Sequence, residues 1–175
     1  MRSKGKGGKP LAKASSPLLQ QLASRPDKLF ANAFLQQYGA LCFRRVDGSA
    51  AIEILVITSR DSGRWIIPKG WPMKKKKPYE AAAIEAWEEA GVRGTVSKRP
   101  VGHYTYLKEL GNGDIAPCIV DVFQVETEES RGEFKELGQR TLDWVTPDEA
   151  ARRVREVELK SLLVRLRPRS RKGSP

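Results

Sequence analysis

The amino-acid sequence predicts an α+β domain built on a mixed β-sheet. Three observations support this class. Strand-like runs come in two pairs, and each pair is joined by a short turn that contains glycine. One helical segment separates the two pairs, and a second helical segment follows the last strand. The length of 175 residues suits one such domain with a hydrophobic core and extensions.

The first half of the chain contains one strand pair and a lysine-rich loop. Residues 38–46 and 51–59 are strand-like, and Asp47-Gly48-Ser49 between them is typical of a hairpin turn. A short apolar run over 64–71 follows and is interrupted by a proline and a glycine. Four consecutive lysines then mark a loop over 71–77.

A helix is predicted over 78–90 and carries carboxylates on one face. Pro78 favours its first position and Gly91 favours its C-terminal end. At about 100° per residue, Glu85, Glu88 and Glu89 fall within an arc of about 100°. The opposite side of the helix holds Ala83, Trp87 and Ala90.

The second half repeats the strand-then-helix order. Residues 101–110 and 117–126 read as strands around the turn Gly111-Asn112-Gly113. Thr146 is a good N-cap and Pro147 a good first helical residue, so a helix is expected to start there and to run to about residue 165.

The charge distribution separates the two ends from a neutral middle. The net charge is +11, with five cations and no acid in 1–13 and six cations and no acid in 159–175. Residues 14–158 are therefore formally neutral, and nucleic acid is a possible partner only through the tails. We predict a disordered basic tail over 1–17, a partly helical arm over 18–37, a globular domain over 38–158 and a basic tail over 159–175.

The composition excludes several classes of site. No apolar run approaches the roughly 20 residues that a membrane span needs. Cys42 and Cys118 are too few and too far apart for a disulfide framework, which favours a cytoplasmic protein. His103 is the only histidine, so a zinc site built on several histidines is excluded. Any metal is expected to be a hard, oxygen-bound ion such as Mg²⁺ or Mn²⁺.

The acidic helix face has two interpretations. Like charges three and four residues apart destabilise a helix by a few tenths of a kcal/mol per pair, roughly. A solvated acidic face is common, whereas a divalent cation would turn the repulsion into binding. The glycine-containing turn and the lysine run that precede the helix favour the metal site, because they place phosphate-friendly donors beside the acids.

The same region resembles a known family. Residues 70–92, GWPMKKKKPYEAAAIEAWEEAGV, are similar to the Nudix box, G-x5-E-x7-R-E-U-x-E-E-x-G-U, where U is apolar. The matching positions are Gly70, Glu85, Glu88, Glu89, Gly91 and Val92. Two positions depart from the box: Lys76 replaces its first glutamate, and Ile84 replaces its arginine, a structural partner of the acids.

The resemblance extends over about residues 38–155. The segments SRDSGRWIIPKG and WVTPDEA look like those of the branch that acts on diphosphoinositol polyphosphates and diadenosine polyphosphates. The resemblance implies a Nudix-type α/β/α sandwich around a mixed sheet. It also implies hydrolysis of a diphosphate linked to another group, with Mg²⁺ or Mn²⁺ as cofactor.

Site residues follow from the same resemblance. Glu85, Glu89 and the main-chain carbonyl of Gly70 are the implied metal ligands, and Glu88 resembles the base or a further ligand. A carboxylate outside the box is usual, and the candidate here is Glu136, with Glu133 second. The positions implied to contact substrate are Thr58, Ser59, Arg60 and Lys69.

Several neighbouring residues are open to two interpretations. Arg64 and Trp65 are expected to hold the turn together rather than to bind substrate. Lys74 to Lys77 either enlarge a positive funnel or form a solvated loop. Tyr104 and Tyr106 share one strand face as core or as pocket lining, and His103 is expected to be structural.

Three functions remain in competition at this point. The first is hydrolysis of a phosphoanhydride in a diphosphoinositol polyphosphate or a dinucleoside polyphosphate. The second is removal of diphosphate from RNA 5′ ends, which the basic tails suggest. The third is a non-catalytic module that binds a phosphorylated ligand, which the two replaced box positions suggest. The oligomeric state does not follow from the sequence.

Overall fold

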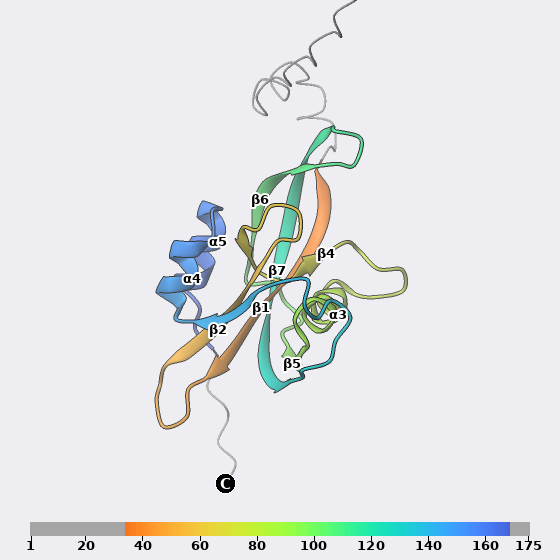
Figure 1. The fold of residues 1–175 in the computed structure, drawn as a ribbon. Coiled ribbons are helices and arrows are strands. Elements are labelled where there is room, and N and C mark those ends of the chain that lie inside the picture. The colour runs from red at the N-terminus through yellow and green to blue at the C-terminus, as the bar shows by residue number, and fades with distance from the viewer. Residues whose placement is uncertain (1–33, 169–175) are drawn as a thin grey trace, which may run out of the picture.

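The computed structural model describes residues 34–168, which form a mixed β-sheet with helices on both faces (Figure 1). The predicted tail over 1–17 and most of the arm over 18–37 lie outside these residues. The strands are β1 (Leu35–Arg45), β2 (Ile52–Thr58), β3 (Trp65–Ile66), β4 (Lys69–Gly70), β5 (Val92–Val96), β6 (Gly102–Glu109), β7 (Ile115–Ser130) and β8 (Leu142–Val145). The helices are α3 (Pro78–Ala90), α4 (Pro147–Arg153) and α5 (Val157–Val164).

The predicted α+β class and mixed sheet are confirmed. The main strand order is β3-β2-β1-β7-β5, while β4 pairs with β1, β6 with β7 and β8 with β2. The long pairing of β1 with β7 is parallel, and the others are antiparallel. Strand β1 begins at Leu35, opposite Cys118, so the sheet starts three residues before the expected boundary at 38.

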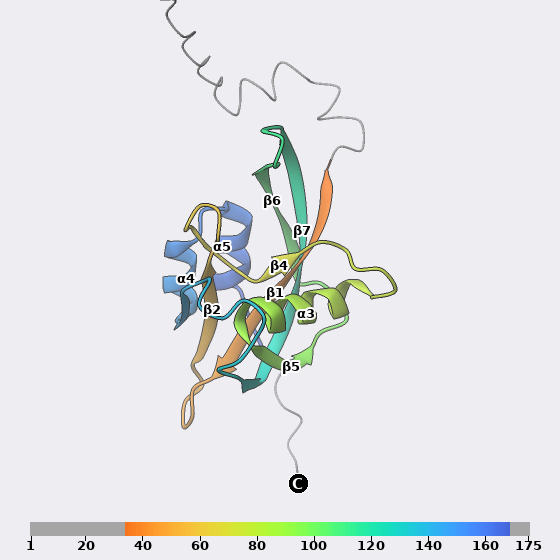
Figure 2. The same cartoon turned by 45° about the vertical axis from the view of Figure 1, so that its right-hand side comes forward.

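Two hydrophobic layers hold the helices to the sheet. On one face, α4 and α5 bury Ala150, Leu159 and Leu163 against sheet residues such as Leu41 and Val120. On the other face, α3 buries small alanines against a separate cluster. The two views show α3 and the α4–α5 pair on opposite sides of the sheet (Figures 1 and 2).

The helix predicted over 78–90 is confirmed at both ends. Pro78 is its first residue, and Gly91 ends it in the left-handed conformation at φ 66°. The main-chain N–H of Lys77 donates to the carboxylate of Glu80 over 2.8 Å, which fixes the start of the first turn. The ends of α3 are therefore set by local sequence, and its phase places the glutamates.

The single helix expected from 147 to about 165 is wrong. Thr146 caps α4 as predicted, with its hydroxyl accepting from the N–H of Glu149, but α4 ends at Arg153 and Val154 is extended. In one straight helix Leu159 would lie about 180° from Ala150. The break lets both residues face the sheet. Packed structure therefore continues beyond 158, where the C-terminal tail was expected to begin.

Three short strands were not predicted as separate elements: β3, β4 and β5. Strand β5 follows α3 directly and pairs with the far half of β7, which runs 16 residues instead of the ten expected over 117–126. Strand β8 pairs with β2 and leads into α4. No helix among residues 34–168 is both long and apolar enough to cross a membrane.

Candidate active site on helix α3

The acidic face of α3 adjoins its buried face. The helix buries Ala82, Ala86 and Ala90 against the sheet, and Glu89 lies beside them with 6% exposure. Trp87, on the side of the helix opposite the acids, is half-buried, and its ring stacks with the guanidinium of Arg93 at 3.9 Å. Because the sheet side is next to the acids, Glu89 is drawn into the protein and Glu88 remains at the surface.

Gly70 lies directly under the carboxylate of Glu85. A Cβ atom at residue 70 would stand 1.9 Å from Oε1 of Glu85. Only glycine leaves room for this carboxylate. Glu85 of helix α3 therefore packs directly against the main chain of strand β4 at Gly70. Glu85 forms no hydrogen bond or ion pair with any residue of the described chain.

Glu89 is held from two sides. Its Oε2 accepts the main-chain N–H of Lys69 over 3.0 Å, and its Oε1 pairs with the guanidinium of Arg140. Both side chains of this ion pair are nearly buried, at 5% and 8% exposure. A buried charge needs such partners, because desolvation of an unpaired carboxylate is costly.

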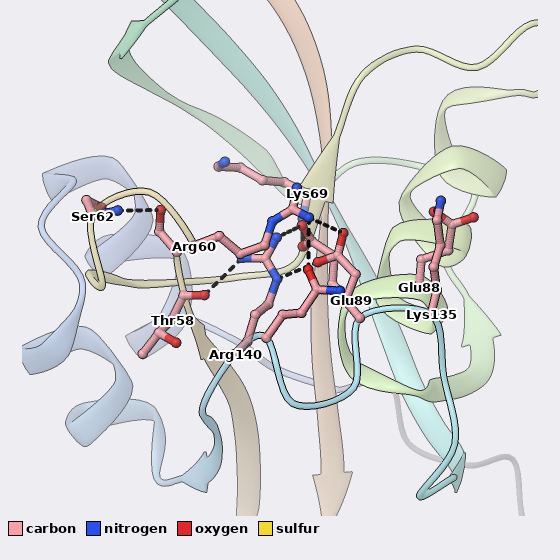
Figure 3. A network of polar contacts seen from close by, with 11 residues as sticks. Thr58, Arg60, Ser62, Lys69, Glu88, Glu89, Lys135 and Arg140 are labelled. Carbon is pink, nitrogen blue, oxygen red and sulfur yellow. Dashed lines mark hydrogen bonds and ion pairs between the residues drawn. The ribbon is translucent and has the colours of Figure 1, made fainter. Parts of the chain in front are cut away.

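Arg140 connects Glu89 to two other segments (Figure 3). It donates to the carboxylate of Glu136 over 2.8 Å and to the main-chain carbonyl of Thr58 over 2.9 Å. Glu136 also pairs with Arg60 at 3.2 Å. Arg140, which no sequence motif marks, thus brings together the predicted residues Glu89, Glu136 and Thr58, and Arg60 joins them through Glu136.

Glu88 lies apart from this network (Figure 3). Its carboxylate pairs with the ammonium group of the exposed Lys135 at 2.6 Å. The main-chain carbonyl of Glu88 accepts the N–H of Glu136 over 3.0 Å, so the loop that carries Glu136 is fastened to α3. Glu133, the second candidate outside the box, is exposed on the same loop.

Burial of the carboxylates raises the pKa values of two of them, and for Glu85 their crowding adds to the shift. Burial, followed by the charges of Glu89, Glu88 and Glu136, raises the pKa of Glu85 from 4.5 to about 7. Burial also raises the pKa of Glu89, while Arg140 and the Lys69 N–H oppose that shift. A site that raises carboxyl pKa values in this way favours a bound cation.

The donor set suits a hard divalent ion, although the side chains are not yet arranged around one. Within residues 34–168 no three acidic, histidine or cysteine side chains converge closely enough to ligate a single ion. Arg140 pairs with the carboxylate of Glu89, and Lys135 pairs with that of Glu88. The carboxylate oxygens and the main-chain carbonyl of Gly70 are the kind of hard oxygen ligands that Mg²⁺ and Mn²⁺ prefer.

A cleft of about 1060 Å³ lies beside the acids. Lys69 joins the two, because its main-chain N–H binds Glu89 while its side chain lines the cleft. The ammonium group of Lys69 lies 4.9 Å from the centre of the Tyr106 ring, and burial lowers the pKa of this lysine. The other charged residues that line the cleft are the cations Arg64, Lys108 and Arg155 and the acids Asp61, Glu109 and Glu156.

The remaining predicted residues divide between the two regions. Ser59 lines the cleft, whereas Arg60 points to Glu136 and Gln139. Arg64 bonds to Ser62 within its own turn, as expected for a residue that holds the turn, and it also lines the cleft. Lys74 to Lys77 are exposed on their loop, and His103 is exposed on β6.

Both tyrosines combine the two roles considered for them. Tyr104 belongs to the core at 1% exposure, and it also lines the cleft, where its hydroxyl has no hydrogen-bond partner among the described residues. Tyr106 packs against the same core and donates its hydroxyl to Gln37 over 2.6 Å. A smaller hollow of about 600 Å³ near Phe43 and Gln124 contains none of the site residues.

Comparison with known sequences decides the family. The sequence model of the NUDIX domain matches residues 35–165, which is most of the chain. The chain belongs to the Nudix family. This Nudix protein is 31% identical over 137 residues to "Nudix hydrolase 16, mitochondrial" of Arabidopsis thaliana, covering 72% of this chain and 76% of that one. It is therefore a hydrolase of phosphoanhydrides, a class that generally uses divalent metal ions.

Other relatives match over shorter spans. Diphosphoinositol polyphosphate phosphohydrolase 2 of Rattus norvegicus is 37% identical over 65 residues, which is 37% of this chain and 35% of that one. Nudix hydrolase 13 of Arabidopsis thaliana is 27% identical over 110 residues, which is 60% of this chain and 54% of that one. The cytoplasmic location expected from the cysteines stays a prediction.

Solved structures confirm the fold. An Ap4A hydrolase of C. elegans aligns with a TM-score of 0.53 at 20% identity, over 75% of this chain and 94% of that one. The NUDIX domain of Shewanella oneidensis NrtR, complexed with ADP ribose, aligns with a TM-score of 0.54 at 13% identity, over 85% and 96%. The predicted Nudix-type fold is therefore correct.

Proposed function

We propose that this protein is a divalent-metal-dependent pyrophosphohydrolase for a highly phosphorylated small molecule, either a diphosphoinositol polyphosphate or a dinucleoside polyphosphate. The observation that carries the proposal is that Lys69 contacts both the acid cluster and the cleft. Its main chain binds the acid cluster, and its side chain lines a cleft whose other charged residues are three cations and three acids, so that the four cations of the cleft exceed its acids by one. A substrate with many phosphates can therefore place one anhydride at the acids and the other phosphates in the cleft.

The residues take the following roles in this proposal. Glu85, Glu89 and the Gly70 carbonyl would hold Mg²⁺ or Mn²⁺, which when bound stabilises negative charge on phosphate oxygens. Thr58, Ser59 and Arg60 would orient the substrate from the end of β2. Arginine suits this task because its planar fork matches phosphate oxygens.

Two carboxylates are candidates for accepting the proton of the attacking water. Glu88 would have to leave Lys135, a partner in an exposed ion pair that is weak. Glu136 is less exposed and already shares Arg140 with Glu89. These contacts favour Glu136 as the carboxylate that accepts the proton. Glu88 would act as a metal ligand or as the base only after its side chain rotates away from Lys135.

The names of the relatives support this choice of substrate. The rat relative is named for a diphosphoinositol polyphosphate, and the structural neighbour from C. elegans for Ap4A. The alternative of RNA 5′ ends was motivated by basic tails that lie mainly outside residues 34–168, so no described contact favours it.

A substrate panel tests the proposal. It compares a diphosphoinositol polyphosphate, Ap4A, ADP-ribose and a 5′-triphosphorylated RNA, with Mg²⁺ or Mn²⁺, in wild type and Lys69→Met. We expect the highest kcat/KM on one of the first two, and a KM about tenfold higher for that substrate in Lys69→Met, as for one lost charge contact of about 1.4 kcal/mol.

The matched control is Lys98→Met, an exposed lysine in the smaller hollow, which should leave KM unchanged. The absence of turnover on the whole panel by folded wild type would contradict the proposal. A preference for ADP-ribose or RNA would contradict the substrate class.

A further inference from the structure

Arg140 uses one guanidinium group to hold three separate segments. Its three nitrogens contact the Glu89 carboxylate on α3, the Glu136 carboxylate on the loop after β7, and the Thr58 carbonyl at the end of β2. The side chain is only 5% exposed. Because the guanidinium is planar and rigid, these contacts fix the three groups relative to one another.

The loop that carries Arg140 is tied down independently of its side chain. The Glu136 N–H donates to the Glu88 carbonyl over 3.0 Å, and the Thr58 and Thr141 main chains bond to each other over 3.0 Å. The Thr141 N–H also donates to the Thr58 hydroxyl over 2.9 Å. Loss of the Arg140 side chain therefore frees the two carboxylates while other bonds still hold the loop.

Charge limits what Arg140 itself does. Arg140 shares one positive charge between Glu89 and Glu136, and Arg60 adds a second at Glu136, while Glu85 nearby has no ion-pair partner in the described chain. When ionised, these three carboxylates carry one charge more than the two guanidinium groups, so the cluster still favours a divalent cation. Arg140 is also more deeply buried than Arg60, which is 52% exposed. Arg140 thus contacts the acids and not the space where substrate enters.

We propose that Arg140 is a positioning residue that sets the distance and orientation between Glu89 and Glu136. It holds the carboxylate expected to bind metal and the carboxylate expected to act on water in one arrangement. This inference rests on the proposed function. It differs from it by predicting a loss of kcat and of metal affinity with an unchanged KM.

The test compares Arg140→Lys, Arg140→Ala and the matched control Arg153→Lys. Arg153 also bonds to two carboxylates, Asp143 and Glu149, but outside the site. We expect kcat and Mn²⁺ affinity to fall about 10- to 100-fold in Arg140→Lys, as is typical when a partner of a metal ligand is removed. KM should stay within about threefold of wild type, since Arg140 makes no substrate contact.

Chemical rescue separates positioning from folding. Guanidinium at millimolar concentration should restore part of kcat in Arg140→Ala, whereas ethylammonium should not, because only the planar group matches both carboxylates. Circular dichroism checks that each variant is folded. Arg153→Lys should keep kcat and Mn²⁺ affinity within about twofold, the range left when a group outside the site is changed.

Three results would overturn the inference. They are unchanged kcat and Mn²⁺ affinity in folded Arg140→Lys, an effect confined to KM, or equal losses in Arg153→Lys. If wild type hydrolyses no substrate, the proposed function fails, and Mn²⁺ titration of wild type and Arg140→Lys still decides the role of Arg140. Weaker Mn²⁺ binding by the variant would then support that role, and equal binding would refute it.

Discussion

The main chain at Gly70 lies directly against the carboxylate of Glu85, so close that a methyl group at residue 70 would stand 1.9 Å from Oε1. The clash falls on the flexible end of a side chain and not on the backbone. We therefore expect Gly70→Ala to fold with Glu85 displaced. Its kcat should fall at least about 100-fold, roughly the loss of one positioned charged group, as measured by steady-state kinetics.

A matched glycine provides the control for this substitution. A Cβ atom at Gly132 would meet nothing within 4 Å, and its backbone is not left-handed. Gly132→Ala should keep wild-type kcat, with thermal unfolding checked for both variants. Wild-type activity in Gly70→Ala would show that catalysis does not depend on the packing of Glu85 against the main chain of residue 70.

The raised pKa of Glu85 predicts how stability of the metal-free protein depends on pH. Between pH 4.5 and about 7 the unfolded chain ionises this carboxyl while the folded protein keeps it protonated. Stability is therefore lost as pH rises through this window. Glu85→Gln removes the loss, so its unfolding free energy relative to wild type should rise by about 1 kcal/mol from pH 5 to pH 8, after discounting for solvent screening.

Urea unfolding in a chelating buffer measures this difference. The exposed Glu133 serves as the control, because Glu133→Gln should change stability equally at both pH values. A Glu85→Gln difference that is the same at pH 5 and pH 8 would show that the carboxylates are not crowded in the folded protein.

The two tyrosines of the cleft should respond oppositely to loss of their hydroxyl groups. The Tyr104 hydroxyl is buried without a partner in the described chain, so Tyr104→Phe should stabilise the protein by about 1 kcal/mol. Tyr106→Phe should destabilise it by about 1 kcal/mol, because Gln37 is left unpaired at 2% exposure. Thermal unfolding of both variants checks the signs.

Kinetics give Tyr104→Phe a second expected outcome. Because the hydroxyl is buried, it does not reach a substrate phosphate, so KM should stay unchanged while stability increases. A destabilised Tyr104→Phe variant would show that the hydroxyl has a structural partner.

Local sequence was sufficient to predict α3 and its acids. Pro78 and Gly91 bound the helix, and the spacing of Glu85, Glu88 and Glu89 fixed their common face. These signals act within a few residues, so they do not depend on the rest of the fold. The hairpin turn at Asp47-Gly48-Ser49 was predicted for the same reason.

Two features of the structure depend on contacts between distant segments and could not be predicted from the sequence: the position of Arg140 and the break between α4 and α5. Arg140 meets Glu89 across 51 residues of chain, and nothing in its own loop marks it as a partner of the acids. The Ile84 position of the box suggested a lost arginine contact, yet a guanidinium reaches the acids from another segment. Likewise, the break at Val154 follows from the need to bury both Ala150 and Leu159 on one sheet face.

Metal-dependent turnover in wild type and Glu89→Gln tests the central claim most directly. Glu89 lies on the acidic face of α3, accepts the main-chain N–H of Lys69 and pairs with the buried Arg140. We expect wild type to hydrolyse a highly phosphorylated substrate only with Mg²⁺ or Mn²⁺, and folded Glu89→Gln to lose at least about 1,000-fold in kcat. Turnover that persists in a chelator, or that survives in Glu89→Gln, would contradict the assignment of α3 as the active site.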